Sequence, residues 1–217
     1  MNRREFSAGA ACLLATSAVF PGALFAQFRP PQEGAEYLTL KQPVNSGIAR
    51  GKVEVIEFFW YSCPHCNAFE PKLEAWIKKL PSDVVIKRVP VAFRADFVPQ
   101  QRLFYTLEAM GKLDQLHGKV FQAIHVNRNP LNRKETILAW AAQQEGLDHA
   151  KFTQLYNSDE INEKSQAALD LQDAFKVEGV PALGIAGRYY TDGGLAGHMD
   201  RALQIADYLI AETRKAR

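Results

Sequence analysis

The sequence predicts an α/β fold in which a block of helices is inserted between two parts of one sheet. Residues 53–91 show a strand-helix-strand pattern, which is typical of parallel strands joined by a right-handed crossover. Residues 97–176 carry apolar positions at helical spacing only. Two short strand patterns after residue 179 then return the chain to the sheet. An all-helical stretch of this length within an α/β chain indicates an insertion.

Residues 1–26 have the three-part order of a secretory signal peptide. Arg3 and Arg4 form a basic start, a small and apolar stretch follows, and cleavage is expected after Ala26, with Ala23 as the alternative. The destination is then the bacterial periplasm, which is oxidising. The paired arginines match a twin-arginine export signal, and an ordinary basic start is the other interpretation. An uncleaved membrane anchor is disfavoured because polar residues, glycine and proline interrupt the apolar run.

The mature chain is expected to begin with a lead-in and its first two strands. Residues 27–36 are polar and predict an extended lead-in, followed by a short edge strand over residues 37–40. Residues 53–60 are β-branched and aromatic, and Glu54 and Glu57 are the charges in that run. This composition predicts a buried strand of a parallel sheet.

A helix and a further strand follow this buried strand. Apolar spacing predicts a helix from Pro64 to about Lys79, with a kink expected at Pro71 because proline cannot donate a backbone hydrogen bond. Residues 84–91 predict the next strand. The paired cysteines before this helix therefore lie at a strand-to-helix turn.

The helical block is predicted to contain five helices. Gly111 and Gly146 are expected to end two of them, and Asn132 with Glu135 forms a capping signal at the start of another. The expected ranges are 103–110, 113–124, 132–145, 148–156 and 158–175.

The last part of the chain predicts a hairpin and a helix. Residues 182–186 and 189–191 are expected to pair across a tight turn at Gly187-Arg188. The glycines of residues 193–197 predict a loop, and residues 198–213 predict an amphipathic helix. The 26 basic and 24 acidic residues of the chain nearly balance, which argues against nucleic acid as a partner.

Cys63 and Cys66 are the cysteines that remain once Cys12 leaves with the signal peptide. A disulfide across so small a ring contributes about 2 kcal/mol, below the roughly 3 kcal/mol of a fifteen-residue loop, so it is a poor structural link. Three residues apart on a helix, the two sulfurs lie on one face and within exchange distance. The pair is therefore predicted to be a reversible redox centre.

Pro64 and His65 sharpen this prediction. Proline is favoured at the first helical position, so Cys63 is predicted to cap the helix and Cys66 to end its first turn. Free backbone N–H groups and the helix dipole would stabilise the Cys63 thiolate, and His65 would add to this, with a solvent-facing spacer as its alternative. We expect Cys63 to be exposed and nucleophilic and Cys66 to be buried. A stabilised thiolate makes the disulfide more oxidising.

The run EFFWYSCPHC at residues 57–66, together with Gly-Val-Pro at 179–181, resembles the DsbA family of periplasmic thiol:disulfide oxidoreductases. The resemblance extends through essentially all of the mature chain. It implies a thioredoxin fold formed by residues 27–96 and 177–217, with an inserted helical domain at residues 97–176. A depressed pKa of the first cysteine and an oxidising disulfide are known for this family, and the resemblance implies them for Cys63 and the Cys63–Cys66 pair.

The resemblance also implies an activity and partners. The Cys63–Cys66 disulfide would be donated to reduced or unfolded exported proteins, and an inner-membrane, quinone-linked partner of the DsbB type would restore it. No cofactor or metal is expected, and the protein is expected to be a monomer. Val180-Pro181 matches the family's cis-proline loop, which would offer backbone groups to an extended substrate.

Glu57 takes the place of the family's buried acid beneath the cysteines. Strand alternation places it among apolar residues, and it would accept the proton of the Cys66 thiol. An ion pair with Lys87 or Arg88 on the neighbouring strand is the alternative, and the two roles are compatible.

The remaining aromatic and histidine residues have less specific interpretations. Phe59 is predicted to be core, whereas Phe58, Trp60 and Tyr61 would either line a peptide groove or cover the helical block. Surface or interdomain roles without metal binding are expected for the other histidines, which are His117, His125, His149 and His198.

Three other functions compete with an oxidase. A reductase or isomerase could share the fold, although residues 27–51 are too short for the association domain of an isomerase. A metal-binding module would use Cys63 and Cys66, with or without His65, to hold Cu(I). A peptide-binding chaperone would not need the cysteines at all.

Overall fold

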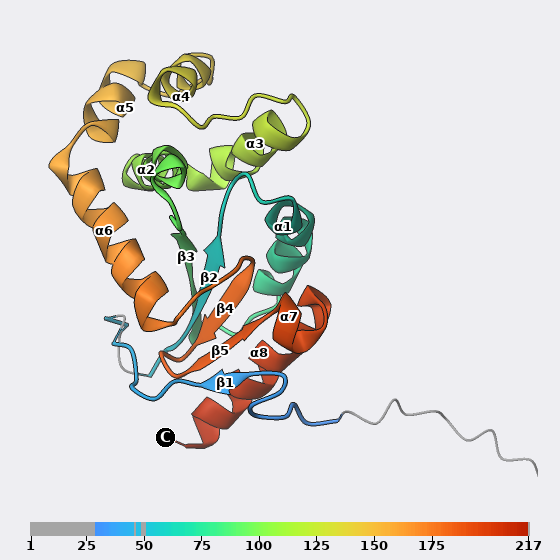
Figure 1. Ribbon diagram of the computed structural model, residues 1–217. Helices are drawn as coiled ribbons and strands as arrows, with labels where there is room; N and C mark the ends of the chain where they lie inside the picture. The colour runs from blue at the N-terminus through green and yellow to red at the C-terminus, as the bar shows by residue number, and fades with distance from the viewer. Residues whose placement is uncertain (1–28, 46, 49–50, 217) are drawn as a thin grey trace, which may run out of the picture.

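The computed structural model describes residues 29–45, 47–48 and 51–216, so the predicted signal peptide lies outside the described residues. Five strands form one mixed sheet in the order β1-β5-β4-β2-β3 (Figure 1). The strands are β1 (Leu38–Thr39), β2 (Val53–Phe59), β3 (Val84–Pro90), β4 (Ala182–Ile185) and β5 (Tyr189–Asp192).

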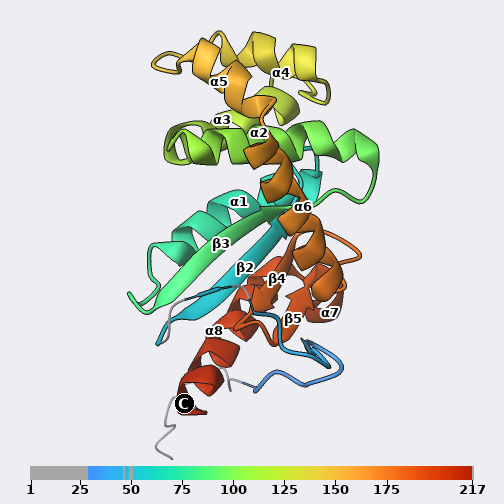
Figure 2. The ribbon, with the colours of Figure 1, turned by 90° about the vertical axis from the view of Figure 1, so that its left-hand side faces the viewer.

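The helices form two groups around this sheet. Helices α1 and α8 pack on one face, whereas α2 to α5 gather beyond one end of the sheet and α6 runs back from them along its other side (Figures 1 and 2). The helices are α1 (Pro64–Ile77), α2 (Val98–Ala109), α3 (Leu113–His125), α4 (Lys134–Ala141), α5 (His149–Tyr156), α6 (Asp159–Ala174), α7 (Gly193–Ala196) and α8 (Met199–Lys215), with a short 3₁₀ helix at Ala95–Phe97. The expected helical insert is therefore present.

Strand β2 is the centre of the sheet and carries the chain into the cysteine pair. All seven of its residues are buried, and it pairs parallel with β3 and antiparallel with β4. Its alternating side chains serve two cores: Val53 and Val55 face α1 and α8, whereas Ile56 and Phe58 contribute to the core shared with the helical block. The prediction of a buried strand with a parallel neighbour is confirmed.

Three predicted helix boundaries are wrong. Helix α4 begins at Lys134 with Arg133 as its N-cap, so Asn132 lies one residue outside the capping position, and the helix ends at Ala141 rather than near Gly146. After Ala141 the backbone turns more tightly, because the Gln144 N–H donates to the Ala141 carbonyl, 3.1 Å away. The α-helix does not continue beyond this point. Helix α2 also starts earlier than expected, at Val98 with a proline in its first turn.

Two predictions near the end of the chain are also wrong. The turn between β4 and β5 has positive φ angles at Ala186 and Gly187, so it is centred one residue earlier than Gly187-Arg188. The glycine-rich segment 193–196 forms the short helix α7 rather than a loop, because the Asp192 carboxylate accepts a hydrogen bond of 2.8 Å from the Leu195 N–H and caps it. The amphipathic helix α8 forms as predicted.

Within the described residues, no helix combines the length and the apolar character that crossing a bilayer would require.

Candidate active site

The cysteine pair lies at the start of α1, where β2 ends. Cys63 is the N-cap residue, with an extended backbone at φ −78° and ψ 117°, and Pro64 occupies the first helical turn. The Cys66 backbone N–H donates to the Cys63 sulfur, 3.4 Å away. The predicted cap, proline position and first turn are therefore confirmed, and the sulfur of Cys63 sits where a capping oxygen would normally accept.

The expectation that Cys63 is exposed is wrong. Only 7% of the surface of Cys63 is exposed, whereas Cys66 is fully buried as predicted. Cys63 is covered because the loop before β4 lies against it, with the Val180 carbonyl oxygen 3.4 Å from the Cys63 Sγ. The Val180–Pro181 peptide bond in that loop is cis, as the resemblance implied. The Cys63 sulfur is therefore largely covered by this loop.

The surroundings of the two sulfurs separate their proton affinities. A hydrogen bond from the Cys66 thiol, followed by backbone N–H groups of Cys66 and His65 and the charge of His65, lowers the pKa of Cys63 to about 6 despite its burial. Burial raises the pKa of Cys66 far above its ordinary value. The pair thus favours a thiolate at Cys63 beside a neutral thiol at Cys66.

Glu57 is the buried acid that the sequence indicated. It is 1% exposed, and its carboxylate lies 3.1 Å from Arg88 Nη1 on the parallel neighbour strand, so the ion pair offered as its alternative interpretation forms. Burial raises the pKa of Glu57 to about 8, and the attraction of Arg88 only partly opposes this. The negative charge of an ionised Glu57 adds to the elevation of the Cys66 pKa, after burial and the effects of Cys63.

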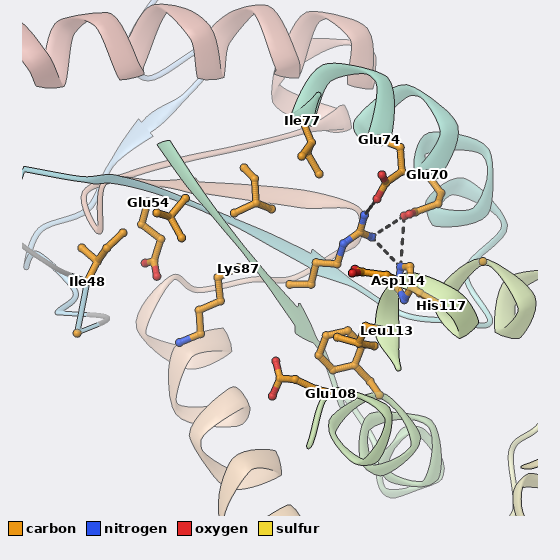
Figure 3. Close-up of a pocket in the computed structure, with 16 residues that line it drawn as sticks. Ile48, Glu54, Glu70, Glu74, Ile77, Lys87, Glu108, Leu113, Asp114 and His117 are labelled. Atoms are coloured by element: carbon orange, nitrogen blue, oxygen red, sulfur yellow. Dashed lines mark hydrogen bonds and ion pairs between the residues drawn. The ribbon is translucent and has the colours of Figure 1, made fainter. Parts of the chain in front are cut away.

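Sequence reasoning missed a charged cluster around Arg88. Arg88 Nη1 lies 2.7 Å from the Glu70 carboxylate and 2.7 Å from His117 Nε2, and Nη2 pairs with Glu74 (Figure 3). The spacing of Glu70 and Glu74 on α1 placed them on one helix face, which is the signal that could have identified them as partners of β3. His117 comes from α3 in the helical block, and no local pattern predicts its approach.

The aromatic residues before the cysteines mostly cover the helical block. Phe58 and Tyr61 are buried, and the Tyr61 hydroxyl lies 2.8 Å from His117 Nδ1, so these two residues do not line a groove. Trp60 is partly buried and stacks on Phe97 with ring centroids 3.8 Å apart.

The four other histidines occupy the surface and interdomain positions that we expected. His117 and His125 connect α3 to the segment before the cysteines, since His125 Nε2 lies 2.8 Å from the Tyr61 carbonyl oxygen. His149 and His198 are exposed. Across the residues that the structure describes, no group of three or more histidine, cysteine or acidic side chains is placed to hold a metal ion.

Two cavities border this region. One of about 490 Å³ is lined by His65, which stands between the cysteines in the sequence, by residues 179–181 and by parts of the α7 segment. The other, of about 960 Å³, follows the edge strand β3 and reaches Glu70, Arg88 and His117, but not the cysteines (Figure 3). The smaller cavity is therefore the one associated with the cysteine pair, through His65 and through the loop that contacts Cys63.

Comparison with known proteins identifies close relatives of this arrangement. Residues 54–204 match the family described as DSBA-like thioredoxin domain. The thiol:disulfide interchange protein DsbA of Bordetella parapertussis is 44% identical over 204 residues, which cover 94% of this chain and 96% of that protein. The DsbA of Pseudomonas aeruginosa is 41% identical over 183 residues, which cover 84% of this chain and 86% of that one.

Solved structures agree with the sequence comparison. The crystal structure of Pseudomonas aeruginosa DsbA matches with a TM-score of 0.80 and 40% identity, over 85% of this chain and 95% of that chain. The crystal structure of oxidoreductase DsbA from Xylella fastidiosa matches with a TM-score of 0.80 and 28% identity, over 86% of this chain and 100% of that chain.

Proposed function

This chain belongs to the DSBA-like thioredoxin family and is a thiol:disulfide oxidoreductase, and from that premise we propose that it works as an oxidase which donates its Cys63–Cys66 disulfide to newly exported proteins. The observation that carries this proposal is the N-cap position of Cys63, where a thiol and two backbone N–H groups lower its pKa to about 6. Whatever stabilises the thiolate stabilises the reduced protein, and its disulfide is then a stronger oxidant.

The donation takes place in two exchange steps. A substrate thiolate attacks Cys63 Sγ, a mixed disulfide forms, and the electron pair of the broken S–S bond leaves on Cys66, which takes up a proton. A second substrate thiolate then attacks the substrate sulfur of the mixed disulfide and releases Cys63 as a thiolate. The substrate loses two electrons and the protein gains them. Cys63 is the better leaving group because its pKa is the lower of the two.

Two further groups have assigned roles in this proposal. Glu57, buried on the strand that leads into the cysteine pair, exchanges the proton of the Cys66 thiol. The Val180-Pro181 loop, which lies against Cys63, offers backbone groups to an extended substrate segment beside the smaller cavity, and His65 supports the thiolate.

The proposal extends to the setting of the reaction. We assign residues 27–96 and 177–217 to the thioredoxin-like domain and residues 97–176 to the inserted helical domain. Reduced exported proteins are the substrates, a quinone-linked membrane protein of the DsbB type reoxidises the dithiol, and residues 1–26 direct the chain to the periplasm. The fold and the relatives support this setting.

Equilibration with glutathione buffers tests the oxidase proposal directly. The reduced and oxidised forms are separated after acid quenching, and we expect the dithiol to persist in buffers that oxidise an ordinary structural cysteine pair. The Cys66→Ser variant serves as the control, because it can form a mixed disulfide with glutathione but cannot close the ring. A midpoint as reducing as that of a cytosolic reductase would refute the proposal.

A further inference from the structure

One terminal nitrogen of Arg88, Nη1, lies within hydrogen-bonding distance of more acceptors than its hydrogens can serve. Nη1 lies 3.1 Å from Glu57 Oε2, 2.7 Å from Glu70 Oε2 and 2.7 Å from His117 Nε2. This nitrogen carries two hydrogens, and arginine stays protonated in proteins. Its other terminal nitrogen is already paired with Glu74. Three groups therefore compete for two hydrogens, and Glu57 has the longest of the three contacts.

The distances indicate which tautomer His117 adopts. Its Nε2 lies 2.7 Å from Arg88 Nη1 but 3.5 Å from the Glu70 carboxylate. A nitrogen this close to a guanidinium N–H must accept, so Nε2 carries no hydrogen. Nδ1 then carries the ring hydrogen and donates it to the Tyr61 hydroxyl oxygen, 2.8 Å away. Burial lowers the pKa of His117 and so favours this neutral form; the hydrogen bond to Glu70 opposes this effect, and the charge of Arg88 adds to it.

Other charged groups also surround the ring, and the nearest acidic one is Glu70, whose carboxylate lies 3.5 Å from His117 Nε2. Glu70 and Glu74 on α1 are both engaged by Arg88, and Glu108 on α2 pairs with Lys164 at 2.9 Å. Two more charged groups, Asp114 on α3 and Lys87 on β3, line the same cavity as His117 (Figure 3). These two residues share the cavity with the ring, whereas Arg88 contacts the ring directly.

We propose that His117 is a positioning residue for the proton transfer at Cys66: by accepting a hydrogen bond from Arg88 Nη1 it weakens the hold of Arg88 on Glu57, and so keeps the buried acid protonated. This inference rests on the proposed function. A protonated Glu57 can give its proton to the Cys66 sulfur at the step in which the disulfide opens. The helical block, through α3, thereby controls an acid that belongs to the sheet.

Two substitutions separate the two ends of the imidazole. The amide of His117→Asn can occupy the position of Nδ1, so it keeps the contact to Tyr61 and loses the contact to Arg88. The amide of His117→Gln reaches the position of Nε2, so it keeps Arg88 and loses Tyr61. Tyr61→Phe also removes that second contact without altering the ring, and it serves as the matched control.

The readout is the titration of Glu57. Its carboxylate band is followed by isotope-edited infrared spectroscopy, with Glu57→Gln subtracted to assign the signal. We expect His117→Asn to lower the Glu57 pKa by half a unit or more, because both hydrogens of Nη1 then serve carboxylates. The pH midpoint for opening of the disulfide by a model dithiol should move in the same direction. His117→Gln and Tyr61→Phe should leave both midpoints in place.

Equal shifts in His117→Asn and His117→Gln, or no shift in either, would overturn the proposal and leave His117 with a packing role. If His117→Asn fails to fold, nitrogen NMR of the unaltered protein decides: a hydrogen on Nε2 of His117 at neutral pH contradicts the proposal, and a bare Nε2 supports it. The outcome is distinct from failure of the oxidase assignment, which the glutathione equilibrium alone determines.

Discussion

The two cysteines of this protein differ in proton affinity because one turn of helix places them in different surroundings. Cys63, at the N-cap, receives hydrogen bonds from the Cys66 thiol and from backbone N–H groups, whereas Cys66 is buried and carries the proton. The largest single cause of the low Cys63 pKa is its neighbour's thiol, and the charge of the exposed His65 comes last. The redox chemistry of Cys63 therefore depends more on Cys66 than on the residue between them.

Substitutions at these two neighbours should raise the Cys63 pKa by different amounts. We expect His65→Ala to raise it by less than one unit, because the backbone N–H groups remain. Cys66→Ala removes the hydrogen bond from the Cys66 thiol, which is the largest cause of the low pKa. It should therefore raise the Cys63 pKa by more than His65→Ala does. The absorbance of the thiolate against pH measures both, and a larger effect of His65→Ala would contradict this ranking.

Glu57 should make the stability of the protein depend on pH. Burial raises its folded-state pKa to about 8, so between its unfolded value, about 4.3, and pH 8 the folded protein binds more protons than the unfolded chain. The free energy of unfolding then falls as pH rises through this window, by up to about 1.4 kcal/mol per unit. The stability present at low pH is lost at high pH.

The Glu57→Gln variant lacks this titration and tests its direction. In the same oxidation state, its free energy of unfolding should increase relative to that of the unaltered protein between pH 5 and pH 8. Guanidinium denaturation at several pH values measures the difference. Parallel curves for the two proteins would show that Glu57 has an ordinary pKa.

At the scale of elements, the β4–β5 turn is set by two residues in the left-handed region. Ala186 has φ +54° and Gly187 has φ +63°, and the Arg188 N–H closes the turn on the Ile185 carbonyl at 3.0 Å. Two positive φ angles define the hairpin turn that prefers Asn-Gly. A β-carbon on Gly187 would lie 2.1 Å from the Val44 carbonyl oxygen, so glycine is required there by its neighbour as well.

This turn offers a paired prediction on stability. Ala186→Asn should raise the free energy of unfolding by about 0.5–1 kcal/mol, because asparagine tolerates the left-handed conformation and alanine is strained in it. Gly187→Ala should lower it by more than about 2 kcal/mol, through strain and the clash with backbone. Urea denaturation of the three proteins measures both effects. A stabilising Gly187→Ala would contradict the turn geometry.

At the scale of the whole molecule, an aromatic cluster joins the helical block to the sheet. Phe121 of α3 packs against Tyr61 and His117 with ring centroids 5.1 Å and 5.2 Å apart, and Phe59 of β2 lies 6.2 Å away. A direct hydrogen bond also joins the helical block to the sheet, since Gln101 of α2 donates to the Pro90 carbonyl at 2.9 Å. The helical block and the sheet thus share one buried core.

Shared burial predicts that the two parts unfold together. Phe121 is 3% exposed, so Phe121→Ala should lower the free energy of unfolding by about 3–5 kcal/mol while the protein keeps a single transition. Far-UV and near-UV circular dichroism followed with temperature measure it. Phe93→Ala, at a residue 37% exposed, is the control and should change stability by less than about 1 kcal/mol. Two separate transitions would show independent domains.

Local sequence patterns predicted the elements that depend on neighbours in the chain. The buried strand, the cap at Cys63, the helix after it and the inserted helices all follow from periodicity, proline position and composition, because these act over a few residues. The helix end near Gly146 and the loop at residues 193–197 were predicted wrongly. At residues 193–197 a side chain outweighed the glycine signal, because Asp192 caps α7. At the end of α4 the change is in the backbone, where the Gln144 N–H bonds to the Ala141 carbonyl.

The sequence by itself determined that two cysteines stand on one face of a helix start, with an acid on the strand below, since spacing along a helix or strand is fixed by the backbone. Only the tertiary structure decided that Val180 covers Cys63, that Arg88 holds Glu57, and that His117 arrives from another part of the chain. These contacts join residues far apart in sequence, and packing of whole elements, which no local pattern encodes, brings them together.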